Sequence, residues 1–131
     1  MIKFFSRFKI IFYLVNLVLI ILYIFPGSLL GFIVYDDIKI QPQITADIVI
    51  SSNHFYVFVL MSFLGILTFY DLKKINSLFI YLIFLSVILE LSHMIIPNRS
   101  FQWSDLFGNL VGVIIVFFIN ILIRKYGIFQ K

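Results

Sequence analysis

The sequence contains no cysteine, and this absence excludes disulfide bonds, thiolate catalysis, iron–sulfur clusters and cysteine-based zinc sites. Charged residues are also scarce, at 12% of the 131 residues. Soluble globular domains carry about 25% charged residues, which keep their surfaces in contact with water. The shortage of charge therefore argues against a water-soluble globular fold.

Apolar residues fill the remaining positions, since 63% of the chain is hydrophobic and it includes 17 Phe and 7 Tyr. The mean hydropathy is +1.13. Such side chains cost little against lipid tails, so the composition predicts an integral membrane protein. Because each spanning helix uses about 20 residues, we expect a single membrane domain over residues 1–131.

Four apolar runs predict four transmembrane helices, at about residues 10–25, 48–70, 76–97 and 106–123. Pro26 and Gly27 end the first helix, because proline removes a backbone donor and glycine favours chain reversal. Residues 27–35 are then expected either to lie at the interface or to re-enter the membrane partway. Glu90 falls inside the third helix, because the uncharged run before it is too short to cross about 30 Å of hydrocarbon. The expected fold class is an all-α polytopic membrane protein with a compact bundle of four transmembrane helices.

Basic residues predict the orientation of this bundle. Those on one side of an alternating topology are Lys3, Arg7, Lys9, Lys73, Lys74, Arg124, Lys125 and Lys131. The positive-inside bias places both termini in the cytoplasm of a multi-pass protein. The net charge of +4 is thus explained by topology, and we expect no nucleic-acid partner. A cleaved signal peptide is the alternative for the N-terminal segment, but an A-x-A-like cleavage site is absent.

Polar side chains inside the predicted spans are few: His54, Glu90, His93, Asp105 and Asn109. Ionisable groups are costly in lipid, so they usually face a bundle interior and mark a functional site. His54 and Glu90 each lie seven residues from the outer end of their predicted helix, which is about 10 Å of depth. We therefore expect all five side chains to converge in the outer leaflet.

Small residues indicate how the helices pack. The second helix carries an inward-facing stripe of Ser51, His54, Phe58, Ser62 and Gly65. Gly108 and Gly112 form a G-x-x-x-G pair that allows close approach of a neighbouring backbone. We expect this pair to press the fourth helix against the helix that carries Glu90, and plain packing is the alternative explanation of the pair.

The connection between the third and fourth helices contains Arg99, one of two basic residues on the outer side. We expect Arg99 to pair with Asp105 or to hold an anionic ligand. A simpler explanation of the polar residues here is that Ser104 caps the fourth helix, with Asp105 stabilised by the helix N-terminus.

The segment from Glu90 to Gly112, ELSHMIIPNRSFQWSDLFGNLVG, resembles the signature of VanZ-like membrane proteins. That signature has a Glu, a Gln three positions later, and then Pro, Arg, an aromatic residue, Asp, Asn and Gly at similar spacing. His54-Phe55 and Pro26 also fit, and the resemblance covers about residues 10–123. The departures are Ser51, Ser52 and Asn53 in place of an Asp-Lys pair, His93 in place of Gln, and Gln102 in place of an acidic residue.

The resemblance implies a small four-helix protein of the bacterial cytoplasmic membrane, related to the cell envelope. The family is named for a member linked to low-level glycopeptide resistance. The family's activity is not established, so the resemblance narrows the fold more than the function.

Two functions from different classes follow from these residues. In the first, an outer-leaflet site binds or modifies a membrane lipid or a lipid-linked or cell-surface molecule. His54 and Glu90 are then the candidate catalytic acid/base pair, and Arg99 holds an anionic group. The remaining ligand-binding candidates are His93, Asp105 and Asn109. In the second, the protein is a non-catalytic accessory or structural membrane protein, with a protein partner in the membrane, and the polar cluster is an interhelical latch.

No nucleophile stands out, so the residues leave open whether any reaction is catalysed. His54, Glu90, His93 and Asp105 are plausible metal ligands by type. The resemblance, however, has Gln at His93, and we interpret His93 as a hydrogen-bonding replacement for it. We therefore expect no metal and no cofactor. A proton relay is not expected, because no further ionisable side chain lies below the cluster in the second to fourth helices.

Overall fold

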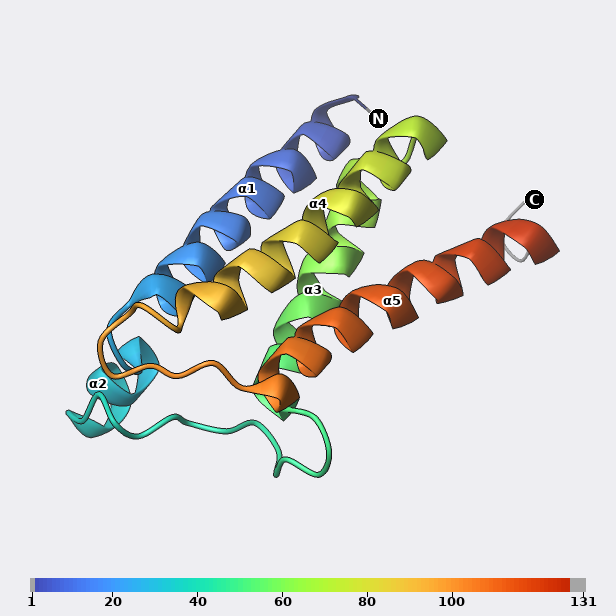
Figure 1. Ribbon diagram of the computed structural model, residues 1–131. Coiled ribbons are helices and arrows are strands. Elements are labelled where there is room, and N and C mark those ends of the chain that lie inside the picture. Colours follow the sequence, from blue (N-terminus) through green and yellow to red (C-terminus); the bar gives the residue numbers. More distant parts are fainter. Residues whose placement is uncertain (1, 128–131) are drawn as a thin grey trace.

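The computed structural model describes the backbone of residues 2–127 and the side chains of residues 8–71 and 73–127. Within these residues the chain forms helices and no strands (Figure 1). The helices are α1 (Ile2–Ile24), α2 (Leu29–Tyr35), α3 (Ser52–Thr68), α4 (Leu72–Ser92) and α5 (Trp103–Tyr126). The all-α class is confirmed. Lys131, and the side chains of Lys3 and Arg7, lie outside the described residues.

Two of the helices, α4 and α5, are long and apolar enough to cross a membrane. α1 and α2 meet the same criterion only as a bent pair, with 85° between Phe8–Ile24 and Leu29–Tyr35. α3 is apolar but has 17 residues, which gives about 26 Å of helix. Their outward surfaces are apolar, as at Phe118 of α5, which is 58% exposed.

The chain turns sharply between α1 and α2, as the sequence predicts. Gly27 has a φ of 97°, in the left-handed region that favours glycine. The Ser28 side chain then caps α2 by accepting a hydrogen bond from the Gly31 N–H at 2.8 Å. α2 ends at Asp36, whose φ is 55°. Residues 29–35 thus form a short helix that runs almost at a right angle to α1.

The long helices alternate in direction (Figure 1). The start of α1, the α3–α4 connection and the end of α5 lie at one end of the bundle. The opposite end, which we call the loop end, holds α2 and residues 25–51 and 93–102. Every polar residue singled out from the sequence is on a helix or connection that reaches the loop end.

The boundaries of α4 and α5 differ from those predicted. α4 ends at Ser92 and does not continue to Pro97. The chain tightens there through backbone hydrogen bonds from His93 to Glu90 and from Met94 to Leu91, both 3.1 Å, a usual way for a helix to end. α5 begins at Trp103, three residues earlier than predicted.

Gly108 and Gly112 pack against α3, and the prediction that they press against the helix carrying Glu90 is wrong. A Cβ on Gly108 would lie 2.7 Å from the Ser51 carbonyl, and one on Gly112 would lie 2.7 Å from the Phe55 carbonyl. The extended connection from α4 carries the start of α5 across to α3, where the Ser51 N–H donates to the Ser104 carbonyl at 3.1 Å. α3 and α5 are consequently the most closely packed pair of helices.

The apolar core lies between the long helices, around Phe58, Met61, Leu82 and Val113, whose side chains are fully buried. The predicted stripe of α3 faces inward, because its members other than His54 are buried and His54 is half-buried. The inward position of the stripe is therefore confirmed.

Candidate functional site

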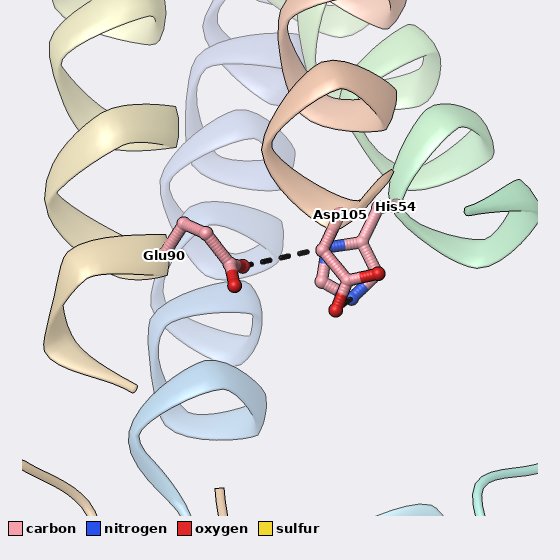
Figure 2. A group of neighbouring side chains, drawn as sticks. All are labelled: His54, Glu90 and Asp105. Atoms are coloured by element: carbon pink, nitrogen blue, oxygen red, sulfur yellow. Dashed lines mark ion pairs between the residues drawn. The ribbon is translucent and has the colours of Figure 1, made fainter. Parts of the chain in front are cut away.

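His54, Glu90 and Asp105 meet at the loop end, from the start of α3, the end of α4 and the start of α5 (Figure 2). His54 Nε2 lies 3.5 Å from Asp105 Oδ2, and His54 Nδ1 lies 4.0 Å from Glu90 Oε2. The Glu90 side chain is fully buried, while those of His54 and Asp105 are 15% and 16% exposed. The predicted convergence of these three side chains is confirmed.

Tyr23, at the end of α1, is the central residue of the cluster and was missed from the sequence. Its hydroxyl donates to Asn109 Oδ1 at 2.7 Å and lies 2.9 Å from His54 Nδ1. The side chain is only 7% exposed. A tyrosine near the predicted outer end of a span is usually an interfacial anchor. The signal that could have identified it is its position three residues before Pro26, level with the other polar groups.

Asn109 joins three further helices to Tyr23. Its Oδ1 lies 3.1 Å from His54 Nδ1, and its Nδ2 donates to the Ser86 carbonyl of α4 at 3.4 Å. Tyr23, His54, Asn109 and Ser86 therefore connect α1, α3, α5 and α4 through one hydrogen-bonded chain. Asn109 is fully buried, as predicted for a group facing the bundle interior.

His93 fixes the end of α1 to the end of α4. Its ring stacks on that of Tyr23 at 5.6 Å between centroids, with 18° between the planes. Its Nε2 lies 3.1 Å from the Tyr23 carbonyl, and its Nδ1 lies 3.3 Å from Glu90 Oε2. His93 thus contacts both Tyr23 and Glu90 and is itself buried.

The carboxylate of Glu90 has two different surroundings. Oε1 accepts a hydrogen bond from the Gln102 N–H at 2.9 Å, at the residue that starts α5. Oε2 is buried and has no hydrogen-bond partner. The alternative in which Ser104 caps this helix is wrong, because Gln102 occupies the N-cap position and the Ser104 hydroxyl instead donates to Asp105 Oδ1 at 3.3 Å.

Arg99 binds the end of α1, and its predicted pairing with Asp105 is not observed. The guanidinium donates from Nη2 to the Leu22 carbonyl at 3.0 Å and from Nε to the Phe25 carbonyl at 3.4 Å. These are carbonyls that the end of a helix leaves without intrahelical partners. Burial lowers the pKa of the Arg99 guanidinium from its usual value, although arginine keeps its charge at neutral pH.

A pocket of about 220 Å³ opens beside the cluster. Its lining is mixed: the polar side chains include Tyr23, His54, His93 and Arg99, and the apolar ones include Leu19, Leu22, Leu29 and Val57. Residues 41–44 of the loop also line it. Asn53 holds this loop, since its Nδ2 donates to the Pro42 carbonyl at 2.6 Å and its Oδ1 accepts from the Ile44 N–H at 2.9 Å.

No protein-family model, curated protein or solved structure matches this chain. The function is therefore inferred from the geometry of the loop end. It combines a buried acid and two imidazoles with a cation, and a pocket lined by both polar and apolar side chains lies next to them.

Proposed function

We propose that the chain is a VanZ-like protein that crosses the bacterial cytoplasmic membrane four times, through α1, α3, α4 and α5. The alternating directions of these helices support this proposal (Figure 1). At 17 residues, α3 is near the short limit of about 17–25 residues for a spanning helix. The resemblance in sequence contributes a second argument, because its signature residues Glu90, Asp105 and Asn109 come together with His54 in one cluster.

The proposed orientation has both termini in the cytoplasm and the loop end outside. Basic residues support it, because those with described side chains at the opposite end of the bundle are Lys9, Lys73, Lys74, Arg124 and Lys125. Acidic residues gather at the loop end, namely Asp36, Asp37, Asp47, Glu90 and Asp105. The positive-inside bias assigns the first group to the cytoplasm.

The function proposed for the loop end is binding of an anionic amphiphile, either a membrane lipid or a lipid-linked molecule of the cell surface. The observation that carries this proposal is the mixed lining of the pocket. Its polar side chains suit a phosphate or carboxylate headgroup, and Leu19, Leu22 and Val57 suit an acyl or prenyl chain. Ligand pockets typically combine such an apolar lining with a few polar groups.

Arg99 is the residue proposed to hold the anionic group. It already donates to two carbonyls of α1, which fix the plane of the guanidinium. A guanidinium has more N–H donors than these two contacts use, so donors remain for a ligand. His54 and Glu90 are proposed as the acid/base pair if the bound molecule is also modified.

The second candidate function is a non-catalytic accessory protein whose cluster latches the helices together. The hydrogen-bonded chain from Tyr23 to Ser86 favours it, since it joins four helices. Such interhelical contacts contribute only about 0.6 kcal/mol each on average in membranes. These contacts also leave Glu90 Oε2 buried without a hydrogen-bond partner, and a purely structural latch would not need an unpaired carboxylate oxygen.

The amphiphile site is tested by incubating the protein in nanodiscs that contain phosphatidylglycerol and phosphatidylcholine. The protein is then purified, and the lipids that it retains are analysed. Val57→Phe fills the pocket without removing a polar group. Leu60→Phe on the same helix is the control, because Leu60 is 49% exposed on the outer surface. We expect wild type and Leu60→Phe to retain phosphatidylglycerol above its bulk fraction, and Val57→Phe to lose the excess. Equal retention by all three proteins, or no excess in wild type, contradicts the site and favours the latch.

A further inference from the structure

In each of the two histidines of the cluster, one ring nitrogen lies within hydrogen-bond distance of an oxygen acceptor and the other faces a carboxylate. The Asn109 amide nitrogen donates to the Ser86 carbonyl, so Asn109 Oδ1 is an acceptor for the groups around it. Tyr23 donates to this oxygen, and His54 Nδ1 lies 3.1 Å from it. The proton of a neutral His54 is therefore on Nδ1. Its Nε2 lone pair faces Asp105 Oδ2 at 3.5 Å.

The ring proton of His93 can be assigned from its hydrogen-bond partner in the same way. Its Nε2 lies 3.1 Å from the Tyr23 carbonyl, which can only accept a hydrogen bond, so the proton of a neutral His93 is on Nε2. The bare Nδ1 then faces Glu90 Oε2 at 3.3 Å. Lone pairs and carboxylate oxygens repel one another at these distances. A positive species between them, either a proton or a metal ion, would remove the repulsion.

Within the described side chains, no lysine or arginine forms an ion pair with Glu90 or Asp105. Arg99, the nearest candidate by sequence, is hydrogen bonded to the carbonyls of Leu22 and Phe25. Glu90 Oε2 is fully buried and lacks a hydrogen-bond partner. An uncompensated buried carboxylate is costly, and coordination of a metal is one of the usual ways in which proteins avoid that cost.

We propose that His54, Glu90 and Asp105 together bind one divalent transition-metal ion of the Zn²⁺ class. One ligand atom from each residue lies within 4.8 Å of those from the other two (Figure 2). Tetrahedral ligands about 2.1 Å from Zn²⁺ are about 3.4 Å apart, close to the 3.5 Å between His54 Nε2 and Asp105 Oδ2. Glu90 Oε2 lies 4.0 Å from the other ring nitrogen, Nδ1, so the Glu90 side chain has to move toward Nε2 to complete the shell. The sequence argument against a metal depended on His93, which is not needed in this ligand set.

The surroundings of His54 match those of a metal ligand. Such histidines usually hold their second ring nitrogen in a hydrogen bond, which sets the orientation of the coordinating one. Tyr23 Oη and Asn109 Oδ1 provide this contact at Nδ1. Three protein ligands leave a coordination position for an exchangeable group, as in catalytic zinc sites. This inference depends on the three ligands alone and does not rest on the proposed amphiphile. When the ion is bound, His54 and Glu90 serve as its ligands and do not act as an acid/base pair.

Binding of Co²⁺ and Zn²⁺ to the purified protein tests the proposal. The protein carries a tag other than polyhistidine, is held in uncharged detergent, and is stripped with a chelator before titration. We expect about one ion per chain after desalting, and Co²⁺ ligand-field absorption of a site with a nitrogen ligand. His54→Gln and Asp105→Asn should each weaken binding by at least about tenfold. Asp36→Asn is the control, because Asp36 is exposed at the loop end and asparagine tolerates its positive φ.

The absence of stoichiometric binding and of a Co²⁺ spectrum in wild type overturns the proposal and leaves protons as the compensating species. Equal binding by wild type and both ligand variants also overturns it. If a variant does not fold, as judged by size-exclusion chromatography, the wild-type stoichiometry and spectrum decide. Loss of binding in Asp36→Asn as well would indicate adventitious surface binding and would likewise contradict the site. Retention of phosphatidylglycerol is measured separately, so failure of the amphiphile proposal is distinguishable from failure of this one.

Discussion

Tyr23 organises the cluster at the scale of single residues, because one hydroxyl serves both His54 and Asn109. Its ring also stacks on His93, and its backbone carbonyl faces the same histidine. Four helices therefore depend on one side chain near the end of α1. Sequence reasoning about charge could not find it, because tyrosine is neutral and is common where spans meet water.

Removal of the Tyr23 hydroxyl should loosen the cluster without dismantling it. In Tyr23→Phe, His54 Nδ1 keeps Asn109 Oδ1 at 3.1 Å as an acceptor, so no buried donor is left unpaired. We expect a loss of about 1 kcal/mol in unfolding free energy. Thermal or denaturant unfolding in detergent measures it. Tyr13→Phe is the control, because Tyr13 is 52% exposed on the same helix, and an equal loss there would contradict the role of Tyr23.

The hydrogen bond that Glu90 makes can be separated experimentally from its negative charge. Its Oε1 accepts the Gln102 N–H, and a glutamine oxygen can do the same. We expect Glu90→Gln to stay within about 1 kcal/mol of wild type, and Glu90→Ala to lose about 1–3 kcal/mol more, because it removes the acceptor of the part-buried Gln102 N–H and leaves a cavity at a fully buried position. Membrane abundance and unfolding of the two variants provide the comparison. Equal stability of the two variants would show that the Gln102 contact is unimportant.

The elements illustrate which parts of the fold a sequence can and cannot predict. The break at Pro26–Gly27 was predictable, because both residue types restrict or reverse the chain locally. The end of α4 was not predictable, because it depends on backbone hydrogen bonds from His93 and Met94 that no particular residue type indicates. The stop at Ser92 leaves residues 93–102 as the connection to α5, whose start is hydrogen bonded to Ser51 next to α3.

The partner of the glycine pair was mispredicted because Gly108 and Gly112 indicate a close contact without identifying the neighbouring helix. The neighbour is α3, against which both glycines leave no room for a methyl group. The polar site was more predictable than the packing, since the depth and cost of buried His54 and Glu90 required them to meet.

A methyl group on Gly112 should separate α3 from α5. The added Cβ in Gly112→Ala would lie 2.7 Å from the Phe55 carbonyl, which is backbone and cannot rotate away. We expect a loss of about 1–3 kcal/mol, typical of overpacking. Unfolding in detergent measures it beside Val111→Ala, a neighbour that is 38% exposed. A stability of Gly112→Ala equal to that of wild type would mean that the two helices are not held this closely.

The orientation of the whole molecule can be read with single cysteines, because the chain has none of its own. Lys74→Cys, in the first turn of α4 next to the α3–α4 connection, should resist an impermeant thiol reagent in intact cells. Gln43→Cys, in the exposed loop of the loop end, should react. Both sites should react after the membrane is opened, which controls for accessibility. Labelling of Lys74→Cys in intact cells would reverse the proposed topology.

The polar site is assembled from residues that are far apart in the chain, from Tyr23 on α1 to Asn109 on α5. A ribosome makes α4 before α5, so in the proposed topology Glu90 would reach the membrane before Gln102 and Asn109 have been synthesised. An unpaired ionisable group in lipid costs several kcal/mol. We therefore expect α4 to stay beside the insertion machinery until α5 has been synthesised. The order of the polar residues along the chain thus sets when Glu90 can first meet its partners during synthesis.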